Sequence, residues 1–377
     1  MIQFKKGTCI YTNKKRPMLY RSRKTLAIVN LSALQDNYTK IANLAPQSKT
    51  IAVIKANAYG HGSVEIAKSL HSIVPAFAVA FIDEAIVLRN AGITLPILVL
   101  EGALTKEDFS IAKQHDFWLM LHNTEQITWL TQHPSYKEKL WIKIDTGMNR
   151  LGFTPELAKQ MLTKLTKKQK ENLVICSHFS SADEIDNPKT KTQIRCLQAF
   201  SKEYSCPLSL ANSAGIINWP QSHANFNRLG LALYGANPIP VKNMPISLKP
   251  VMTLQSTIIG LRELSPGEYV GYGETWQAKQ PSIIATVAIG YADGYPRNAQ
   301  AGTPVFINNE LAPLAGRVSM DMITVDVTKL THVSLGDVVE LWGENLSVEV
   351  VAEHMNTINY ELLTCVSARV PKVYIEK

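Results

Sequence analysis

Hydrophobic positions between about residues 50 and 240 alternate between short apolar runs and amphipathic stretches. The runs lie at 51–54, 76–80, 97–100, 118–121, 140–144, 174–178, 208–211 and 229–233. Near-continuous apolar runs of this length are typical of parallel strands that are buried on both faces. The stretches between them, such as 63–70 and 155–165, carry apolar residues three and four apart and predict helices. Eight such repeats predict a (β/α)8 barrel, also called a TIM barrel.

The pattern changes after about residue 250. Segments 282–288, 322–327 and 338–342 are β-rich, and turns such as Asn308-Asn309 join them. This texture predicts a separate, mainly antiparallel β-domain. We therefore expect an α/β barrel domain over residues 27–245 and a β-domain over 250–377, with the Pro-rich span 237–240 at the transition. The additional apolar run at 26–31 has a natural place as a strand paired with the β-domain.

Length and composition agree with a two-domain globular enzyme. The chain has 377 residues, of which 46% are hydrophobic and 19% charged. The formal net charge is +8, but dense basic residues occur only within residues 1–24. A solvated basic N-terminal extension explains this pattern better than a nucleic-acid site does.

The cysteines and the hydropathy pattern bear on the compartment. The five cysteines are widely spaced and include no CxxC pair, which argues against a disulfide framework and against a zinc site. No apolar run reaches membrane-spanning length, and no signal-type apolar stretch follows the basic N-terminus. We expect a cytoplasmic enzyme with no metal ion and no membrane partner.

Lys55 directly follows the first apolar run and is the first candidate for catalysis. A lysine at such a place is costly to bury as a cation, and a desolvated lysine amine can form a Schiff base. A lysine that reaches solvent or pairs with an acid explains the position as well. Beyond it, Gly60 and Gly62 permit close backbone approach to a ligand, and Tyr59 lies within reach of a phosphate.

Residues 52–62, AVIKANAYGHG, resemble the attachment segment for pyridoxal 5′-phosphate (PLP) in the alanine racemases, which are fold-type III PLP enzymes. The resemblance covers nearly the whole chain after the first two dozen residues. It implies that PLP is bound as a covalent Schiff base to Lys55. It also implies that the enzyme interconverts L-alanine and D-alanine by a two-base mechanism and supplies D-alanine for peptidoglycan.

Residues 143–153, KIDTGMNRLGF, resemble a second segment of this family. The resemblance implies that Arg150 contacts the phenolic oxygen of the cofactor and the substrate carboxylate, a role that suits a rigid cationic fork. The lysine at the matching position is often carbamylated, so Lys143 is a candidate for carbamylation. An unmodified Lys143 paired with a carboxylate is the alternative.

Further cofactor contacts are implied where later strands end, which is where barrel enzymes carry their functional side chains. His178 would pack against the cofactor ring, and a hydrogen-bonded core histidine is the alternative. The other implied contacts, mostly to the phosphate, are Tyr59, Asn212, Ser213, Gly230, Leu231 and Tyr360.

Arg228 would face the pyridine nitrogen of PLP by the same resemblance. Arginine stays charged because its pKa lies far above neutral pH, so it leaves that nitrogen unprotonated. Proton return to the substrate is then favoured over transamination, as a racemase requires.

Racemisation needs a base on each face of a planar centre. Residues 270–276, VGYGETW, resemble the family's catalytic-tyrosine segment, which implies Tyr272 as the second base opposite Lys55. A tyrosine titrates near 10 and needs cationic neighbours to act at neutral pH. The resemblance assigns D-alanine to Lys55 and L-alanine to Tyr272, and places Tyr272 in the partner's site of a head-to-tail homodimer. A turn tyrosine without catalytic duty is the alternative.

Residues 316–322, GRVSMDM, resemble the family segment in which Met320 and Asp321 lie at the substrate carboxylate. Many members have Cys where Ser319 stands and Gln where Met322 stands. Residues 290–297, GYADGYPR, resemble the segment that lines the entrance, to which Tyr360 also contributes.

Two other functions fit parts of the sequence. One is a racemase of another small amino acid such as serine, because pocket shape separates substrates differing by one or two atoms by only ~1–3 kcal/mol. The other is a PLP-binding barrel without catalysis. Such proteins typically consist of the barrel alone, so the β-domain with Tyr272 and Met320 argues against that reading.

Overall fold

The computed structural model describes residues 23–136, 138–240 and 244–376. Most of the basic extension expected over 1–24 therefore lies outside the described residues. By internal contacts the chain forms two compact units. Of the described residues, one unit comprises those within 35–233 and 237–248, and the other comprises 23–34, 234–236 and 249–376.

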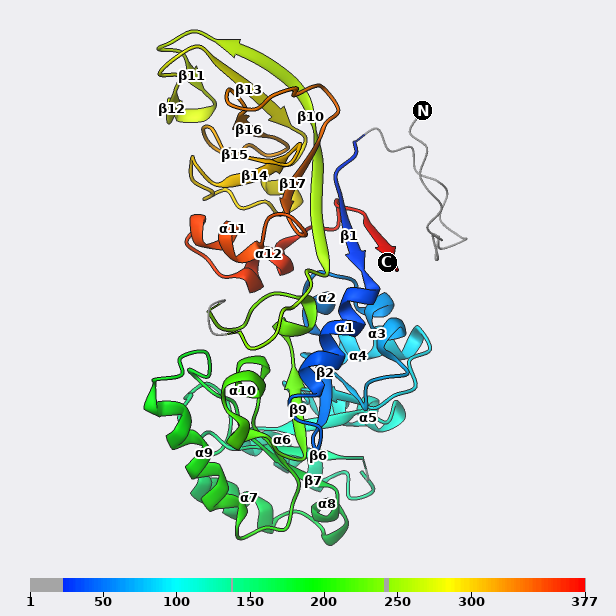
Figure 1. Ribbon diagram of the computed structural model, residues 1–377. Helices are drawn as coiled ribbons and strands as arrows, with labels where there is room; N and C mark the ends of the chain where they lie inside the picture. The colour runs from blue at the N-terminus through cyan, green and yellow to red at the C-terminus, as the bar shows by residue number, and fades with distance from the viewer. Residues whose placement is uncertain (1–22, 137, 241–243, 377) are drawn as a thin grey trace. The chain divides into compact units, whose positions relative to one another are not determined.

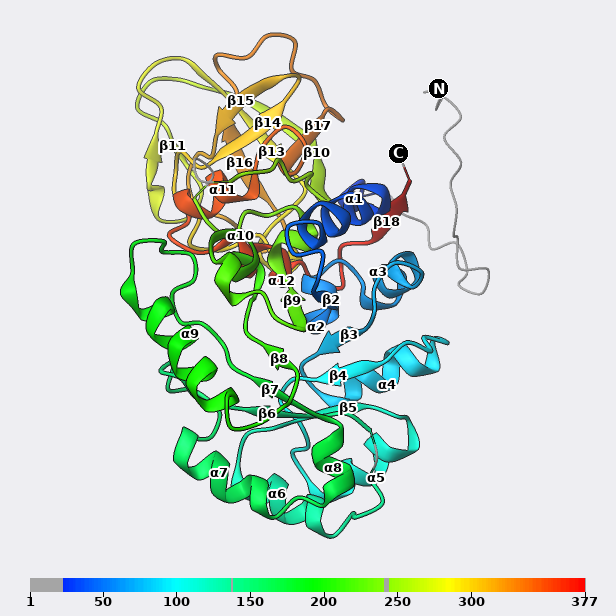
Figure 2. The ribbon, with the colours of Figure 1, turned by 60° about the horizontal axis from the view of Figure 1, so that its bottom comes forward.

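The first unit is a closed barrel of eight parallel strands, which confirms the expected fold class (Figure 2). Its strands are β2 (Lys49–Val53), β3 (Phe77–Val79), β4 (Ile97–Val99), β5 (Trp118–Leu121), β6 (Leu140–Lys143), β7 (Leu173–Cys176), β8 (Leu208–Ser209) and β9 (Phe226–Leu229). Nearly all of their residues are buried, which is why they read as continuous apolar runs. The rings of Trp118, Trp141 and Phe226 pack together near the starts of their strands. They fill the N-terminal end of the barrel and leave its C-terminal end for chemistry.

Helices and short turns precede, separate or follow these strands along the chain, and most of the longer helices lie outside the strands in Figures 1 and 2. They are α1 (Leu31–Ala42), α2 (Lys55–Tyr59), α3 (Ser63–Leu70), α4 (Ile82–Asn90), α5 (Lys106–Gln114), α6 (Thr124–Thr131), α7 (Pro155–Thr163), α8 (Lys167–Glu171), α9 (Pro188–Ser201) and α10 (Ser213–Asn218), with short 3-10 turns η1 (Pro220–Ser222) and η2 (Leu231–Tyr234). Several begin at a side-chain cap, as at Asn123, Thr154 and Asn187.

The last barrel strand differs from the expectation. The apolar run 229–233 was expected to be a strand, but β9 ends at Leu229 and the run continues as η2. Ser213 Oγ accepts the backbone N–H of Gly230 at 2.9 Å, and the N–H of Leu233 bonds to the carbonyl of Gly230. The run is buried, and burial alone does not distinguish a strand from a tight turn. β7 likewise ends at Cys176, two residues before His178.

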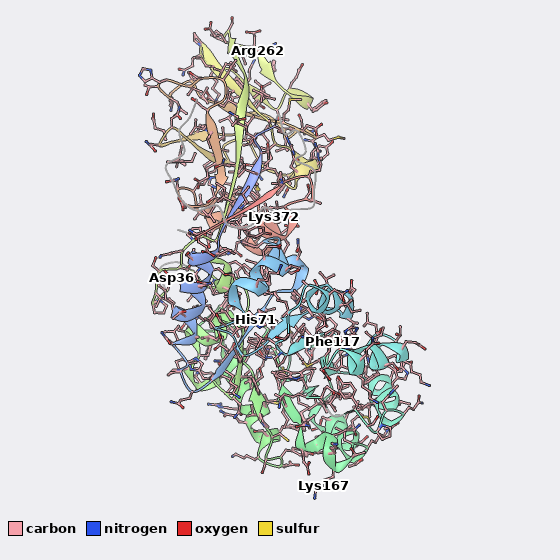
Figure 3. The ribbon with its side chains drawn as sticks, turned by 90° about the vertical axis from the view of Figure 1, so that its right-hand side faces the viewer. Asp36, His71, Phe117, Lys167, Arg262 and Lys372 are labelled. Carbon is pink, nitrogen blue, oxygen red and sulfur yellow. The ribbon has the colours of Figure 1, made fainter. Side chains whose placement is uncertain are left out.

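The second unit is built on an eight-stranded, mostly antiparallel sheet. Its strands are β1 (Leu26–Asn30), β10 (Met252–Leu264), β13 (Ser282–Val287), β14 (Pro304–Ile307), β15 (Glu310–Pro313), β16 (Ile323–Asp326), β17 (Val338–Trp342) and β18 (Lys372–Ile375). β1 pairs antiparallel with β10 and parallel with β18, so the first described strand belongs to this unit. Figure 3 labels Arg262 on β10 and Lys372 on β18.

Smaller elements complete the second unit. They are the hairpin β11 (Tyr269–Val270) and β12 (Trp276–Gln277), the 3-10 turns η4 (Tyr272–Glu274) and η5 (Tyr291–Asp293), and the helices α11 (Val348–His354) and α12 (Asn359–Cys365). The chain enters this unit briefly at 234–236 and again at 249, on either side of the expected transition at 237–240. Within the described ranges, no helix is long and apolar enough to cross a membrane.

Candidate active site

Lys55 stands directly after the buried strand β2, at the start of a left-handed turn. Ala56, Asn57, Ala58 and Tyr59 have φ between 51° and 55°, and Gly60 follows with φ 81°. A run of left-handed non-glycine residues is costly, so surrounding contacts must hold it. The side-chain Oδ1 of Asn57 accepts the N–H of Ser63 at 2.9 Å, and the backbone carbonyl of Asn57 accepts the N–H of Gly62. The half-buried Lys55 is thereby held by a rigid backbone.

Glu84 is the main acceptor for this turn, and sequence reasoning missed it. Its Oε1 accepts the N–H of Ala56 at 2.6 Å, and its Oε2 accepts the N–H of Ala80 at 2.7 Å. One carboxylate therefore ties the turn after β2 to the end of β3. Glu84 is the third residue of α4, where a glutamate reaching back to the residues before a helix is a recognisable capping pattern. That pattern was the available signal.

Two hydroxyls and a backbone segment form a small cradle beyond this turn. Tyr59 and Ser213 are both buried. Ser213 Oγ lies 2.9 Å from the N–H of Gly230, and a Cβ at Gly230 would lie only 2.8 Å from the Tyr59 hydroxyl. Asn212 caps α10 by accepting the N–H of Gly215 at 2.9 Å and so orients Ser213. Leu231, also buried, follows Gly230 at the start of η2.

Arg228 is buried on β9, and its hydrogen bonds end on neutral atoms. Its guanidinium donates to Ser209 Oγ at 2.5 Å and to the carbonyls of Ser177 and Leu210 at 2.7 and 3.1 Å. It also lies 3.3 Å from Nδ1 of His178. A buried cation held in this way keeps its orientation and much of its positive potential.

His178 lies beside this guanidinium. Burial lowers its pKa well below the usual value, and the positive charges of Arg228, Lys143, Arg150 and Lys55 act in the same direction. The ring is therefore neutral at physiological pH, and Nδ1 serves as the acceptor for Arg228.

Lys143 ends β6, and Arg150 lies on the loop that follows. Both line one recess with His178 and Ser177. Burial lowers the pKa of Lys143; the charges of Arg228 and Arg150 also lower it, while Cys176 and Glu101 oppose them. Asp145 Oδ1 accepts three consecutive backbone N–H groups, from 147 to 149, and so shapes the loop that presents the exposed Arg150.

The remaining predicted residues belong to the second unit. Tyr272 begins η4 at the tip of the β11–β12 hairpin and is 66% exposed. Gly271 and Gly273, with φ 73° and 70°, allow the tight turn, and the Arg317 side chain lies next to Gly273. Met320 and Tyr360 are also exposed, at 54% and 39%. The exposed Asp321 pairs through Oδ1 with Arg369 at 2.8 Å.

The barrel unit thus brings together Lys55, Tyr59, Lys143, Arg150, His178, Asn212, Ser213, Arg228, Gly230 and Leu231 at the ends of its strands or in the loops that follow them. A buried hydroxyl cradle and a cationic cluster at that end of a closed parallel barrel are typical of a barrel enzyme that binds a small anionic molecule.

Comparisons with known proteins agree with this class and narrow it. The N-terminal domain of the alanine racemases matches residues 29–238, and their C-terminal domain matches residues 251–374. The alanine racemase of Alteromonas mediterranea is 46% identical over 93% of this chain and 99% of its own length. The biosynthetic alanine racemase of Pseudomonas aeruginosa has a TM-score of 0.88 at 42% identity, over 93% of this chain and 99% of that one.

A further solved structure is the alanine racemase of Bartonella henselae with covalently bound pyridoxal phosphate. It has a TM-score of 0.84 at 32% identity and covers 93% of this chain and 99% of its own. The chain belongs to the alanine racemase family, whose members are PLP-dependent isomerases that act on alanine. The match over 251–374 leaves no room for the alternative of a PLP barrel alone.

Proposed function

We propose that the chain interconverts L-alanine and D-alanine with PLP held on Lys55, and with Lys55 and Tyr272 as the two bases. The observation that carries this proposal is the arrangement around Lys55. The lysine leaves β2 on a rigid left-handed turn whose last residue, Tyr59, joins Ser213 and Gly230 in the hydroxyl cradle. Its charge also acts on His178 within the cationic cluster.

The donors in this unit fit PLP. The cradle of Tyr59, Ser213 and Gly230, with Asn212 and Leu231 beside it, would hold the phosphate. His178 would contact the ring, and Arg228 would keep the ring nitrogen free of a proton. When bound, PLP supplies an electron sink that acidifies the α-hydrogen of the amino acid.

The chain's own groups then hold and move the proton. Arg150 and the backbone amide of Met320, with Asp321 next to it, hold the substrate carboxylate. Nζ of Lys55 takes or returns the α-proton on the face used by D-alanine, and the Tyr272 oxygen does so on the face used by L-alanine. Tyr272→Phe should therefore slow α-hydrogen exchange from L-alanine more than from D-alanine. Equal slowing of both would contradict the assignment of faces.

The active unit in this proposal is a homodimer. Tyr272 and Met320 are largely exposed in one chain, although both are expected to act on substrate. A partner chain that covers these two residues would account for their exposure and would bring them to a substrate site. The cytoplasm is the proposed compartment, because the described cysteines Cys176, Cys196, Cys206 and Cys365 are all free thiols, as a reducing environment would keep them.

Carbamylation of Lys143 belongs to the same proposal. The lowered pKa of Lys143 raises the fraction of neutral amine, the form that adds CO2 with release of a proton. The resulting anion would neutralise part of the charge of Arg150 and orient it. Intact mass should increase by one CO2 in bicarbonate for the wild type but not for Lys143→Ala. No increase in the wild type, or the same increase in both proteins, would refute the modification.

Replacement of Lys55 by alanine tests the central assignment. The wild-type protein should show the visible band of lysine-bound PLP and should racemise alanine in a chiral chromatographic assay. Lys55→Ala should lose both, whereas Lys113→Ala, a change on α5 in the same unit, should keep both. Retention of the visible band in Lys55→Ala would refute Lys55 as the attachment site. Serine assayed in parallel measures the strictness for alanine.

A further inference from the structure

We propose that Asp293 is a positioning residue for substrate binding. It would act through an ion-pair cluster in which the buried Asp293 pairs with Arg23 and Arg369. This cluster would fix the segment 318–322, which carries Met320. The inference rests on the proposed function, in which the backbone amide of Met320 binds the substrate carboxylate.

The side chain of Asp293 is completely buried at the end of η5. Its Oδ2 accepts from Nη1 of Arg23 at 2.7 Å and from the N–H of Gly290 at 3.1 Å. Its Oδ1 lies 3.6 Å from Nε of Arg369. A buried carboxylate is stable only when such partners compensate its charge. Arg23 precedes β1 and Arg369 precedes β18, so the carboxylate joins three separate parts of the second unit.

Arg369 extends the cluster to the predicted substrate segment. Its Nη2 donates to Oδ1 of Asp321 at 2.8 Å, while its Nε faces Asp293. One rigid guanidinium therefore connects a buried carboxylate to the residue next to Met320. This contact engages one oxygen, Oδ1, of the Asp321 carboxylate.

Backbone hydrogen bonds also join the segment that ends at Asp293 directly to the segment that carries Met320. The N–H of Tyr291 donates to the carbonyl of Ser319 at 3.0 Å, and the N–H of Ala292 donates to the carbonyl of Met320 at 3.0 Å. A Cβ at Gly290 would lie 2.3 Å from the first of these carbonyl oxygens and 2.4 Å from the second. The two segments are therefore in contact with no space for a side chain between them.

Peptide geometry explains how this contact could act on substrate. The N–H of Met320 belongs to the same planar peptide as the carbonyl of Ser319. In a trans peptide the two groups point in opposite directions. When Tyr291 fixes the Ser319 carbonyl, it also fixes the direction of the Met320 N–H. Asp293 in turn holds Tyr291 in place, because its carboxylate accepts the N–H of Gly290 and pairs with Arg23.

Asp293→Asn tests the inference because it keeps the shape of the side chain and removes its charge. The KM for both alanine enantiomers should rise about tenfold, while kcat changes by less than about twofold. A tenfold rise is the effect expected when the substrate carboxylate loses its charge-assisted hydrogen bond from the Met320 N–H. The inhibition constant of propionate, which offers a carboxylate without an amine, should rise by the same factor. A merely structural role would instead lower the PLP content, the dimer mass or the melting temperature.

Asp337→Asn is the matched control. Its carboxylate accepts the N–H of Ser334 and Nδ2 of Asn308 in the same unit, away from this cluster. KM and the propionate constant should stay at wild-type values. Arg369→Gln supplies a second variant, at a half-exposed side chain, in case Asp293→Asn does not fold.

Arg369→Gln should raise both constants as Asp293→Asn does, and the double variant should raise them by less than the product of the two factors. If Arg369→Gln racemises alanine with an unchanged KM and an unchanged propionate inhibition constant, the inference about Asp293 is overturned and the proposed function stands. A wild-type protein that does not racemise alanine would overturn the proposed function instead.

Discussion

At the scale of single residues, the barrel site gathers positive charge around one neutral histidine. His178 is surrounded by Arg228, Lys143, Arg150 and Lys55, and it accepts rather than donates toward Arg228. Protonation of its ring would place a further cation in this cluster and break that contact. The neutral state of His178 is therefore built into the fold.

This arrangement predicts a pH dependence of stability. The unfolded histidine titrates near its usual value of about 6.5, and burial and the neighbouring cations hold the folded pKa well below it. Below pH ~6.5 the unfolded state therefore binds a proton that the folded state does not, and the free energy of unfolding falls as the pH falls. The contribution is fully present above pH ~6.5.

Urea unfolding of the wild type and of His178→Asn between pH 8 and pH ~5 measures the effect. Asn can still accept from Arg228 but does not titrate, so the variant should lose up to ~1.4 kcal/mol per pH unit of the acid slope. His354→Asn, at an exposed histidine on α11, should keep the wild-type slope. Parallel slopes in the wild type and His178→Asn would contradict the explanation.

At the scale of elements, the left-handed turn after Lys55 costs the folded barrel conformational free energy. Each left-handed non-glycine residue costs about 1–2 kcal/mol, whereas glycine adopts this region freely. The N–H of Ala56 bonds to Glu84, an interaction that glycine would keep. The added entropy of glycine in the unfolded chain costs about 0.5–1 kcal/mol. Relief of the backbone cost is therefore the larger effect.

Ala56→Gly should consequently raise the free energy of unfolding by about 0.5–1 kcal/mol, and Ala56→Val should lower it because a β-branched residue adopts this region poorly. Ala199→Gly, at an exposed position within the right-handed helix α9, should lower it by about 1 kcal/mol. Chemical denaturation of the three variants checks these signs. A loss of stability in Ala56→Gly as large as in Ala199→Gly would show that the turn is not strained.

The same elements show what a sequence can predict. The buried strands could be found because parallel strands are apolar along their whole length. The candidate site residues were instead proposed from the resemblance of short segments to the alanine racemases, and several of them also follow strand ends. The left-handed turn, the 3-10 course of η2 and the contacts of Glu84 depend on hydrogen bonds between segments distant in sequence. Periodicity carries no information about such bonds. The Asp293 cluster was missed for the same reason, since its arginines lie about 270 and 76 positions away from it in the sequence.

At the scale of the whole molecule, the predicted bases lie on different units. Lys55 belongs to the barrel, and Tyr272 lies at the exposed tip of a hairpin in the β-unit. If a dimer completes each site, Lys55 of one subunit would work with Tyr272 of the other. An exposed hairpin tip is well suited to that arrangement, because a partner can cover it without rearrangement of either core.

Mixing two inactive variants would test this arrangement. Lys55→Ala lacks one base and Tyr272→Phe lacks the other, so each homodimer contains only damaged sites. A hybrid dimer has one site in which Lys55 of the Tyr272→Phe chain meets Tyr272 of the Lys55→Ala chain. If subunits exchange randomly after mild denaturation and refolding, half of the dimers are hybrids with one intact site in two, so activity should return to about a quarter of the wild-type value. Native mass spectrometry, with an affinity tag on one of the two variants, measures the fraction of hybrid dimers and so calibrates the exchange. If both bases instead came from one chain, no hybrid would contain an intact site, and the mixture of the two variants would show no more activity than the sum of its parts.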